Sequence, residues 1–178
     1  MARSGMQVVG VDAREENLER ARFVAEAMGI TDVVYREGRV ETLANNLGGR
    51  RFDLTLFLGV LYHVEDPMLC LRQVAAVTGE MCIVETQVVD EVEGVAEWGA
   101  REWQRPYQGI LALIDETGEF DAGIRETGMT PMATCPSPKA LRFMLLQAGF
   151  RRVERIPPHD GAYEQHARGK RVVYAAWK

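Results

Sequence analysis

Short apolar runs alternate with amphipathic segments along most of the chain. The runs predicted as strands cover residues 7–11, 32–36, 52–58, 81–89, 150–156 and 171–177. Between them, apolar side chains at helical spacing predict helices over about 14–28, 66–79 and 137–149, with a shorter helical turn over 41–46. Strands that alternate with helices are typical of parallel sheets with right-handed crossovers. The pattern therefore predicts an α/β layered fold in a single domain, residues 1–178.

Two of the predicted helices have clear start signals. Asp66-Pro67 and Ser137-Pro138 each place a side-chain acceptor directly before a proline. The acceptor can bond to first-turn amides, and proline fits the first helical position. Gly79 and Gly149 are natural stops for the same two helices.

The segment 90–136 interrupts this alternation and is predicted to be an insertion or lid. Long irregular segments in compact domains are usually functional. It holds Trp98, Trp103 and Tyr107, which are candidates for packing on a substrate, with core packing as the alternative for at least one of them. A helix is predicted over residues 109–116.

Composition narrows the class of protein. The 178 residues are 47% hydrophobic and 26% charged, which is ordinary for a globular domain. No apolar run is long enough to cross a bilayer, and the first residues do not resemble a signal peptide. Three cysteines and three histidines are scattered without metal-ligand spacing, which predicts a cytoplasmic protein without a metal. A net charge of −5 argues against tight nonspecific binding of nucleic acid.

The run Gly59-Val60-Leu61-Tyr62-His63 is the strongest functional signal. It follows the predicted strand 52–58, and ligands of open α/β sheets bind at the carboxyl ends of strands. Tyr62 is predicted to pack on or hydrogen-bond a ligand. His63 is a candidate general base, because free histidine titrates near neutral pH, or a structural histidine bonded to nearby backbone.

Other strand ends carry weaker signals. Asp12 directly follows a strand, where a carboxylate either binds ribose hydroxyls or caps the next helix. The second strand is followed by Gly38-Arg39-Val40-Glu41. The glycine either lets the backbone come close to a ligand or belongs to an ordinary turn. Glu85, late in the fourth strand, needs a partner if it is buried, either as a structural pair or as part of the site.

Several of these motifs together resemble class I S-adenosylmethionine-dependent methyltransferases. Within that family the pattern is similar to the carboxymethyl-transferring tRNA wobble-uridine enzyme and its methyltransferase relatives. The motifs that carry the resemblance are Val40-Glu41-Thr42-Leu43, Gly59-Val60-Leu61-Tyr62-His63, Pro67, Val84-Glu85-Thr86-Gln87-Val88-Val89-Asp90, Pro136-Ser137, Ala148-Gly149-Phe150 and Gly169-Lys170-Arg171-Val172-Val173.

The resemblance implies a Rossmann-like sheet with helices on both faces and S-adenosylmethionine as cofactor. It implies that Asp12 holds the ribose, that Val40 and Glu41 flank the adenine, and that Leu58 lies by the cofactor. Tyr62 is implied to face the transferred group. Arg171 occupies the position of a C-terminal site arginine, or is a surface cation at a strand start.

Two departures from the family change the expectation. The family begins with a strand and a Gly-x-Gly-x-Gly loop, but only eleven residues precede Asp12. We therefore expect an N-terminally truncated chain in which the first strand and glycine-rich loop are absent. Its sheet should show a central gap, or strands 7–11 and 53–58 should pair directly. The stretch before Pro136-Ser137 also lacks the Asn-Val-x-Phe pattern of the carboxymethyl enzyme, which favours an ordinary methyl donor.

The sequence thus predicts transfer of a methyl group from S-adenosylmethionine to a small molecule, with tRNA as the alternative acceptor. His63 is the candidate base for an oxygen acceptor. A second hypothesis is a non-catalytic remnant that acts as an interaction domain. A third, a dinucleotide oxidoreductase, is disfavoured by the Gly-Val-Leu-Tyr-His run.

Overall fold

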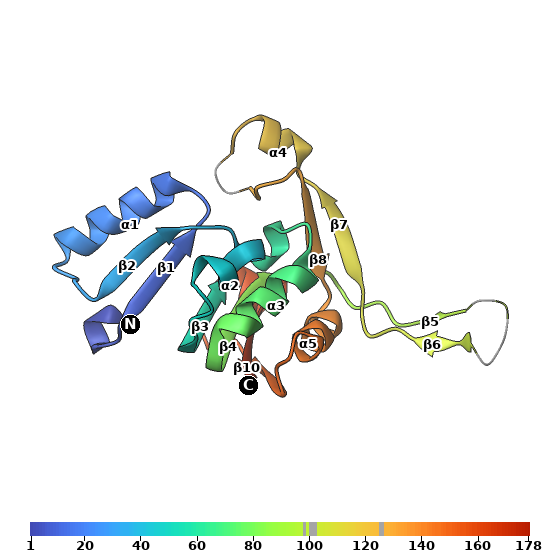
Figure 1. The fold of residues 1–178 in the computed structure, drawn as a ribbon. Coiled ribbons are helices and arrows are strands. Elements are labelled where there is room, and N and C mark those ends of the chain that lie inside the picture. The colour runs from blue at the N-terminus through green and yellow to red at the C-terminus, as the bar shows by residue number, and fades with distance from the viewer. Residues whose placement is uncertain (98, 100–102, 125–126) are drawn as a thin grey trace.

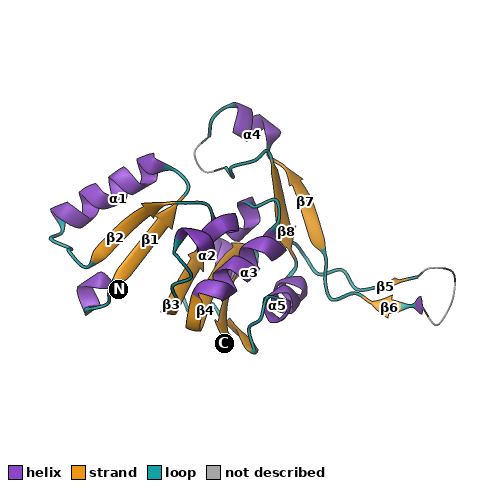
Figure 2. Ribbon diagram, viewed as in Figure 1, coloured by secondary structure: helices purple, strands orange, loops and turns teal. Residues whose placement is uncertain are grey.

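The computed structural model describes residues 1–97, 99, 103–124 and 127–178, as a main body with a narrow arm (Figures 1 and 2). Its helices are α1 (Glu15–Ala27), α2 (Leu43–Asn46), α3 (Pro67–Val77), α4 (Thr117–Asp121), α5 (Pro138–Gln147) and α6 (Glu164–Ala167). Its strands are β1 (Val8–Asp12), β2 (Val33–Glu37), β3 (Phe52–Leu58), β4 (Thr78–Gln87), β5 (Val95–Ala96), β6 (Arg105–Pro106), β7 (Leu111–Asp115), β8 (Met132–Pro136), β9 (Arg152–Ile156) and β10 (Arg171–Trp177). The predicted α/β alternation is confirmed.

The main sheet has the strand order β3-β4-β10-β9. β3 runs parallel to β4, whereas β10 is antiparallel to both of its neighbours, so the sheet is mixed. This places the start of β10 beside the carboxyl end of β4, at the edge of the sheet where β3 also ends, because antiparallel strands run in opposite directions.

β1 and β2 form a separate parallel pair. Of the two outcomes expected at this point of the sheet, the structure shows the gap. Within the described residues β1 and β3 do not pair, and Figure 1 shows the β1-β2 unit with α1 standing apart from the main sheet.

The hydrophobic core lies between the main sheet and the helices α3 and α5. Leu71, Val74, Leu141 and Leu145 from the two helices are almost completely buried there. On β3, Phe57 points into this core and is buried. Alternate residues of a strand face opposite sides of its sheet, and on the other side Leu56 and Leu58 are about half exposed.

Both predicted helix starts are confirmed. The Asp66 carboxylate accepts a hydrogen bond from the amide of Leu69 (2.9 Å), and Ser137 Oγ accepts one from the amide of Ala140 (3.5 Å). Each satisfies a first-turn N–H group that has no partner within its helix.

The prediction of a helix over residues 109–116 is wrong. Those residues contain β7, which pairs antiparallel with β8, a strand that the sequence pattern did not reveal. A short apolar run cannot be assigned to helix or strand by periodicity alone, and here the pairing with β8 decides. Further along the segment, β5 and β6 form the arm that extends from the body in Figure 1.

Helices that are long and apolar enough to cross a bilayer do not occur in the described ranges.

Leu71→Ala should lower the free energy of unfolding by about 2–5 kcal/mol, because it removes a fully buried side chain from a packed core. Leu113→Ala is the matched control, since Leu113 is 70% exposed, and should change it by less than about 0.5 kcal/mol. Urea unfolding followed by circular dichroism measures both. Equal effects would contradict the assignment of the core.

Candidate functional site

A cavity of about 740 Å³ lies between β1 and β3 and extends from the start of both strands to the residues that follow their carboxyl ends. At the carboxyl ends it is lined by all the predicted cofactor-binding residues and by His63; the five are Asp12, Val40, Glu41, Leu58 and Tyr62. Residues that the sequence spreads over 52 positions are thus brought to one cavity.

Asp12 is the last residue of β1 and holds the start of α1. Its Oδ1 atom accepts hydrogen bonds from the amide of Arg14 (2.8 Å) and from Asn17 Nδ2 (3.1 Å). The helix-capping interpretation of Asp12 is wrong, because the N-cap of α1 is Arg14 and has no side-chain cap; Oδ1 instead stabilises the turn that leads into the helix. Both of these hydrogen bonds use Oδ1, so Oδ2 is the carboxylate oxygen that could accept a hydrogen bond from a ligand.

The next wall of the cavity is the turn after β2. The amide of Gly38 donates to the carbonyl of Asp12 (2.9 Å), which fixes this turn beside the end of β1. Arg39 forms an ion pair with Glu41 (3.0 Å), and this hydrogen bond lowers the pKa of the Glu41 carboxyl below its usual value. Glu41 is therefore charged at neutral pH, while Val40 offers an apolar surface.

Gly59 allows the chain to leave β3 sharply. Its amide donates to the carbonyl of Glu85 (3.0 Å), and its φ of 70° lies in the left-handed region that favours glycine. A short 3-10 helix, Leu61–His63, follows at once. It presents Tyr62 and His63 at the cavity, with their ring centroids 4.0 Å apart.

Glu85 has the partner that its burial requires. Arg171, at the start of β10, donates to Glu85 Oε1 (2.9 Å) and also to the hydroxyl of Tyr62. The Arg171 guanidinium lies 4.8 Å from the Tyr62 ring centroid. The Arg171 side chain is only 18% exposed, so it is not a surface cation but a bridge between β4 and the Tyr62 loop.

A second, smaller cavity of about 290 Å³ is also lined by Tyr62. Its apolar lining comes from Val88, Val89, Ile114 and Cys135, and its polar lining from Gln87, Glu116, Gln165 and Lys170. Burial raises the pKa of the Cys135 thiol, so this group stays protonated at neutral pH and contributes apolar surface rather than a nucleophile.

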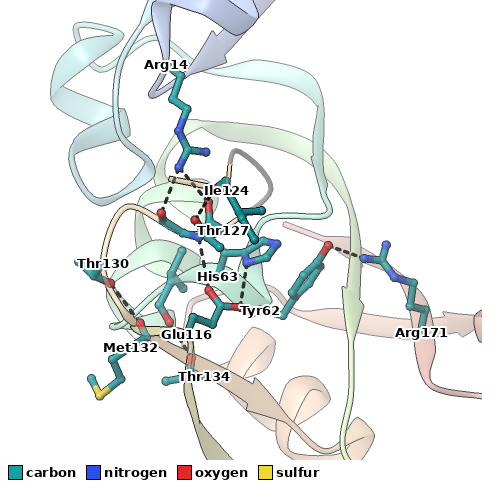
Figure 3. A network of polar contacts seen from close by, with 12 residues as sticks. Arg14, Tyr62, His63, Glu116, Ile124, Thr127, Thr130, Met132, Thr134 and Arg171 are labelled. Carbon is teal, nitrogen blue, oxygen red and sulfur yellow. Dashed lines mark hydrogen bonds and ion pairs between the residues drawn. The ribbon is translucent and has the colours of Figure 1, made fainter. Parts of the chain in front are cut away.

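Residues 127–130 lie against His63, as Figure 3 shows. Glu116 Oε1 lies 3.4 Å from His63 Nδ1, and Glu116 Oε2 lies 3.4 Å from the amide of Gly128. Arg14 reaches across from the start of α1 and donates to the carbonyls of Thr127 (3.0 Å) and Gly128 (3.1 Å). One network thus joins the end of β1 to the Tyr62-His63 loop.

The three predicted substrate aromatics do not join this network. Trp103 and Tyr107 flank β6 on the arm, outside the lining of both cavities, and Trp103 is 58% exposed. Trp98 lies outside the described residues. Glu116 and Arg14 take part instead, and no local sequence signal singled them out.

Groups of three or more potential metal ligands do not occur among the described residues.

Comparison with known proteins identifies the family. A family model described as "Methyltransferase domain" matches residues 1–122. The chain belongs to this methyltransferase family. The Rossmann-like methyltransferase fold expected from the sequence is thereby confirmed.

Two of the curated relatives carry the same name. The chain is 33% identical over 134 residues to a "Ubiquinone biosynthesis O-methyltransferase" of Ruegeria sp. (strain TM1040), covering 66% of this chain and 53% of that protein. It is 31% identical over 150 residues to the protein of the same name from Parvibaculum lavamentivorans, covering 76% and 57%. The chain spans about half the length of these relatives. Since they are not named as tRNA enzymes, the narrower resemblance to the wobble-uridine enzyme stays a prediction.

Solved structures agree on the fold. The N-terminal domain of EvdMO1, crystallised in the presence of S-adenosylhomocysteine and D-fucose, has a TM-score of 0.70 and 27% identity, covering 97% of this chain and 66% of that one. A methyltransferase from Mesorhizobium loti has a TM-score of 0.57 at 18% identity, covering 96% and 80%, and supports the fold alone.

Gly128→Ala should displace the 127–130 segment from His63, because an added Cβ would collide with the His63 carbonyl oxygen. We expect faster hydrogen exchange at residues 127–130 by mass spectrometry. Gly118→Ala is the matched control, since a Cβ there meets nothing within 4 Å. Unchanged exchange in the Gly128 variant would show that the segment does not pack on His63 in solution.

Proposed function

We propose that this chain carries the active site of an S-adenosylmethionine-dependent O-methyltransferase that acts on a small hydroxylated molecule. The observation that carries the proposal is that Tyr62 and His63 line the large cavity and that Tyr62 also lines the smaller one. The names of the curated relatives support the O-methyl assignment.

The residues along the large cavity fit the cofactor. Asp12 has a carboxylate oxygen available for the ribose hydroxyls, and a carboxylate after a strand is a common ribose ligand. Val40 and Glu41 would flank the adenine, and Leu58 offers apolar surface beside the cofactor. S-adenosylmethionine, when bound, supplies a methyl group on a sulfonium centre. The solved relative bound to S-adenosylhomocysteine supports this choice of cofactor.

The smaller cavity fits the acceptor. Its volume of about 290 Å³ and its partly apolar wall favour a small ring over a nucleic acid. The acceptor hydroxyl would lie near Tyr62, which lines both cavities, and would reach the large cavity, where His63 would accept its proton as the new O–C bond forms and the methyl–sulfur bond of the donor breaks. Most of the acceleration would come from holding the two reactants in line.

Asp12→Ala should weaken binding of S-adenosylhomocysteine about 10- to 100-fold, the loss expected for a hydrogen bond to a charged group. Isothermal titration calorimetry measures the affinity. Asp32→Ala is the control, because Asp32 is exposed and does not line the cavity, and it should bind normally. A folded wild-type chain that does not bind the ligand would favour the non-catalytic interaction domain instead.

His63→Ala should lower kcat for methyl transfer about 10²- to 10⁴-fold, the usual contribution of a general base, without changing the affinity for S-adenosylhomocysteine. Formation of S-adenosylhomocysteine is followed with catechol as acceptor and with D-fucose as the non-aromatic comparison. Transfer to catechol by both wild type and variant at the same rate would remove His63 from the mechanism.

A further inference from the structure

His63 Nδ1 is a buried polar atom that lacks a well-formed hydrogen bond among the described residues. A buried N–H group without an acceptor is costly, so such an atom calls for a nearby partner. The carboxylate of Glu116 lies 3.4 Å away and is itself largely buried, with 17% of its side chain exposed. The pair connects the end of β3 with the end of β7, 53 positions later in the chain.

Glu116 is held in place by the 127–130 segment. Its second oxygen faces the amide of Gly128 at 3.4 Å, and Gly128 packs against the His63 backbone. Arg14 donates hydrogen bonds to the carbonyls of Thr127 and Gly128 and so anchors that segment to the start of α1. These contacts hold the Glu116 carboxylate in the position in which it faces the His63 ring.

We infer that Glu116 is the positioning residue of His63, and this inference rests on the proposed function. By accepting a hydrogen bond from Nδ1–H, Glu116 Oε1 selects the tautomer in which the other ring nitrogen, Nε2, carries the free electron pair. Figure 3 shows the Nδ1 edge of the ring turned toward Glu116 and the second nitrogen turned away from it. Nε2 is then the atom that takes the proton of the acceptor hydroxyl.

The charge of Glu116 has a second consequence for the same step. When His63 takes up the proton it becomes positively charged, and a carboxylate 3.4 Å from the ring stabilises that form. A neutral amide of the same shape keeps the oxygen acceptor for Gly128 but removes this stabilisation. Glu116→Gln therefore separates positioning of His63 from support of the 127–130 segment.

The test compares Glu116→Gln with Glu119→Gln, which makes the same chemical change at an exposed residue of α4. We expect Glu116→Gln to lower kcat with catechol about 10- to 100-fold, with the KM for S-adenosylmethionine unchanged and the control normal. Glu116→Asp, which keeps the charge, should recover part of the loss. In a His63→Ala background the Glu116→Gln change should have no further effect, because it acts through His63. An equal loss in both backgrounds would overturn the inference.

A second measurement does not depend on catalysis. Long-range ¹H–¹⁵N spectra of ¹⁵N-histidine-labelled chain report which ring nitrogen of His63 bears the proton, with His63→Ala for assignment. We expect the Nδ1–H tautomer in the wild type and in Glu119→Gln, and a mixed population in Glu116→Gln. An Nε2–H tautomer in the wild type would overturn the inference even if the enzyme is active. Conversely, the expected tautomers in a chain that methylates neither catechol nor D-fucose would uphold the pair and reject the proposed function.

Discussion

The parallel pairing of β3 with β4 is the constraint on which the site depends. Leu58 pairs with Glu85, and the amide of Gly59 extends the pairing by one more hydrogen bond to the Glu85 carbonyl. The Tyr62-His63 loop therefore starts directly beside the Glu85 side chain. Arg171 reaches that carboxylate because β10 is antiparallel to β4 on its other side. Removing Arg171 would leave His166, whose Nε2 lies 3.6 Å from Glu85 Oε1, as the remaining basic group at this buried carboxylate, and proteins tolerate a weakly compensated buried charge poorly.

The parts of the structure that follow from local chemistry were predictable from the sequence. Asp66 and Ser137 bond to amides three positions ahead, so a short motif contains all the information for the helix start. The turn at Gly59 likewise needs only a glycine at the end of an apolar strand. The need of Glu85 for a partner follows from burial alone, although the sequence did not identify Arg171 as that partner.

The missed features all depend on contacts between distant segments. β7 is a strand because β8 pairs with it, and a five-residue apolar run carries no sign of that partner. Arg14 contacts Thr127 across 113 positions, and Glu116 meets His63 across 53. In a single sequence, an arginine at a helix start and a glutamate at a strand end look like ordinary surface charges. Only the folded arrangement gives them a role.

The position of the candidate site residues has a consequence for how ligand preference can change. Val40 and Glu41 lie in the turn after β2, and Tyr62 and His63 lie in the loop after β3, outside the paired strands. Side chains in such loops can be exchanged without breaking the hydrogen bonds that hold a sheet together. New specificity can therefore arise in these two loops and in the segment that carries Glu116, while the pairing of β3 with β4 stays the same.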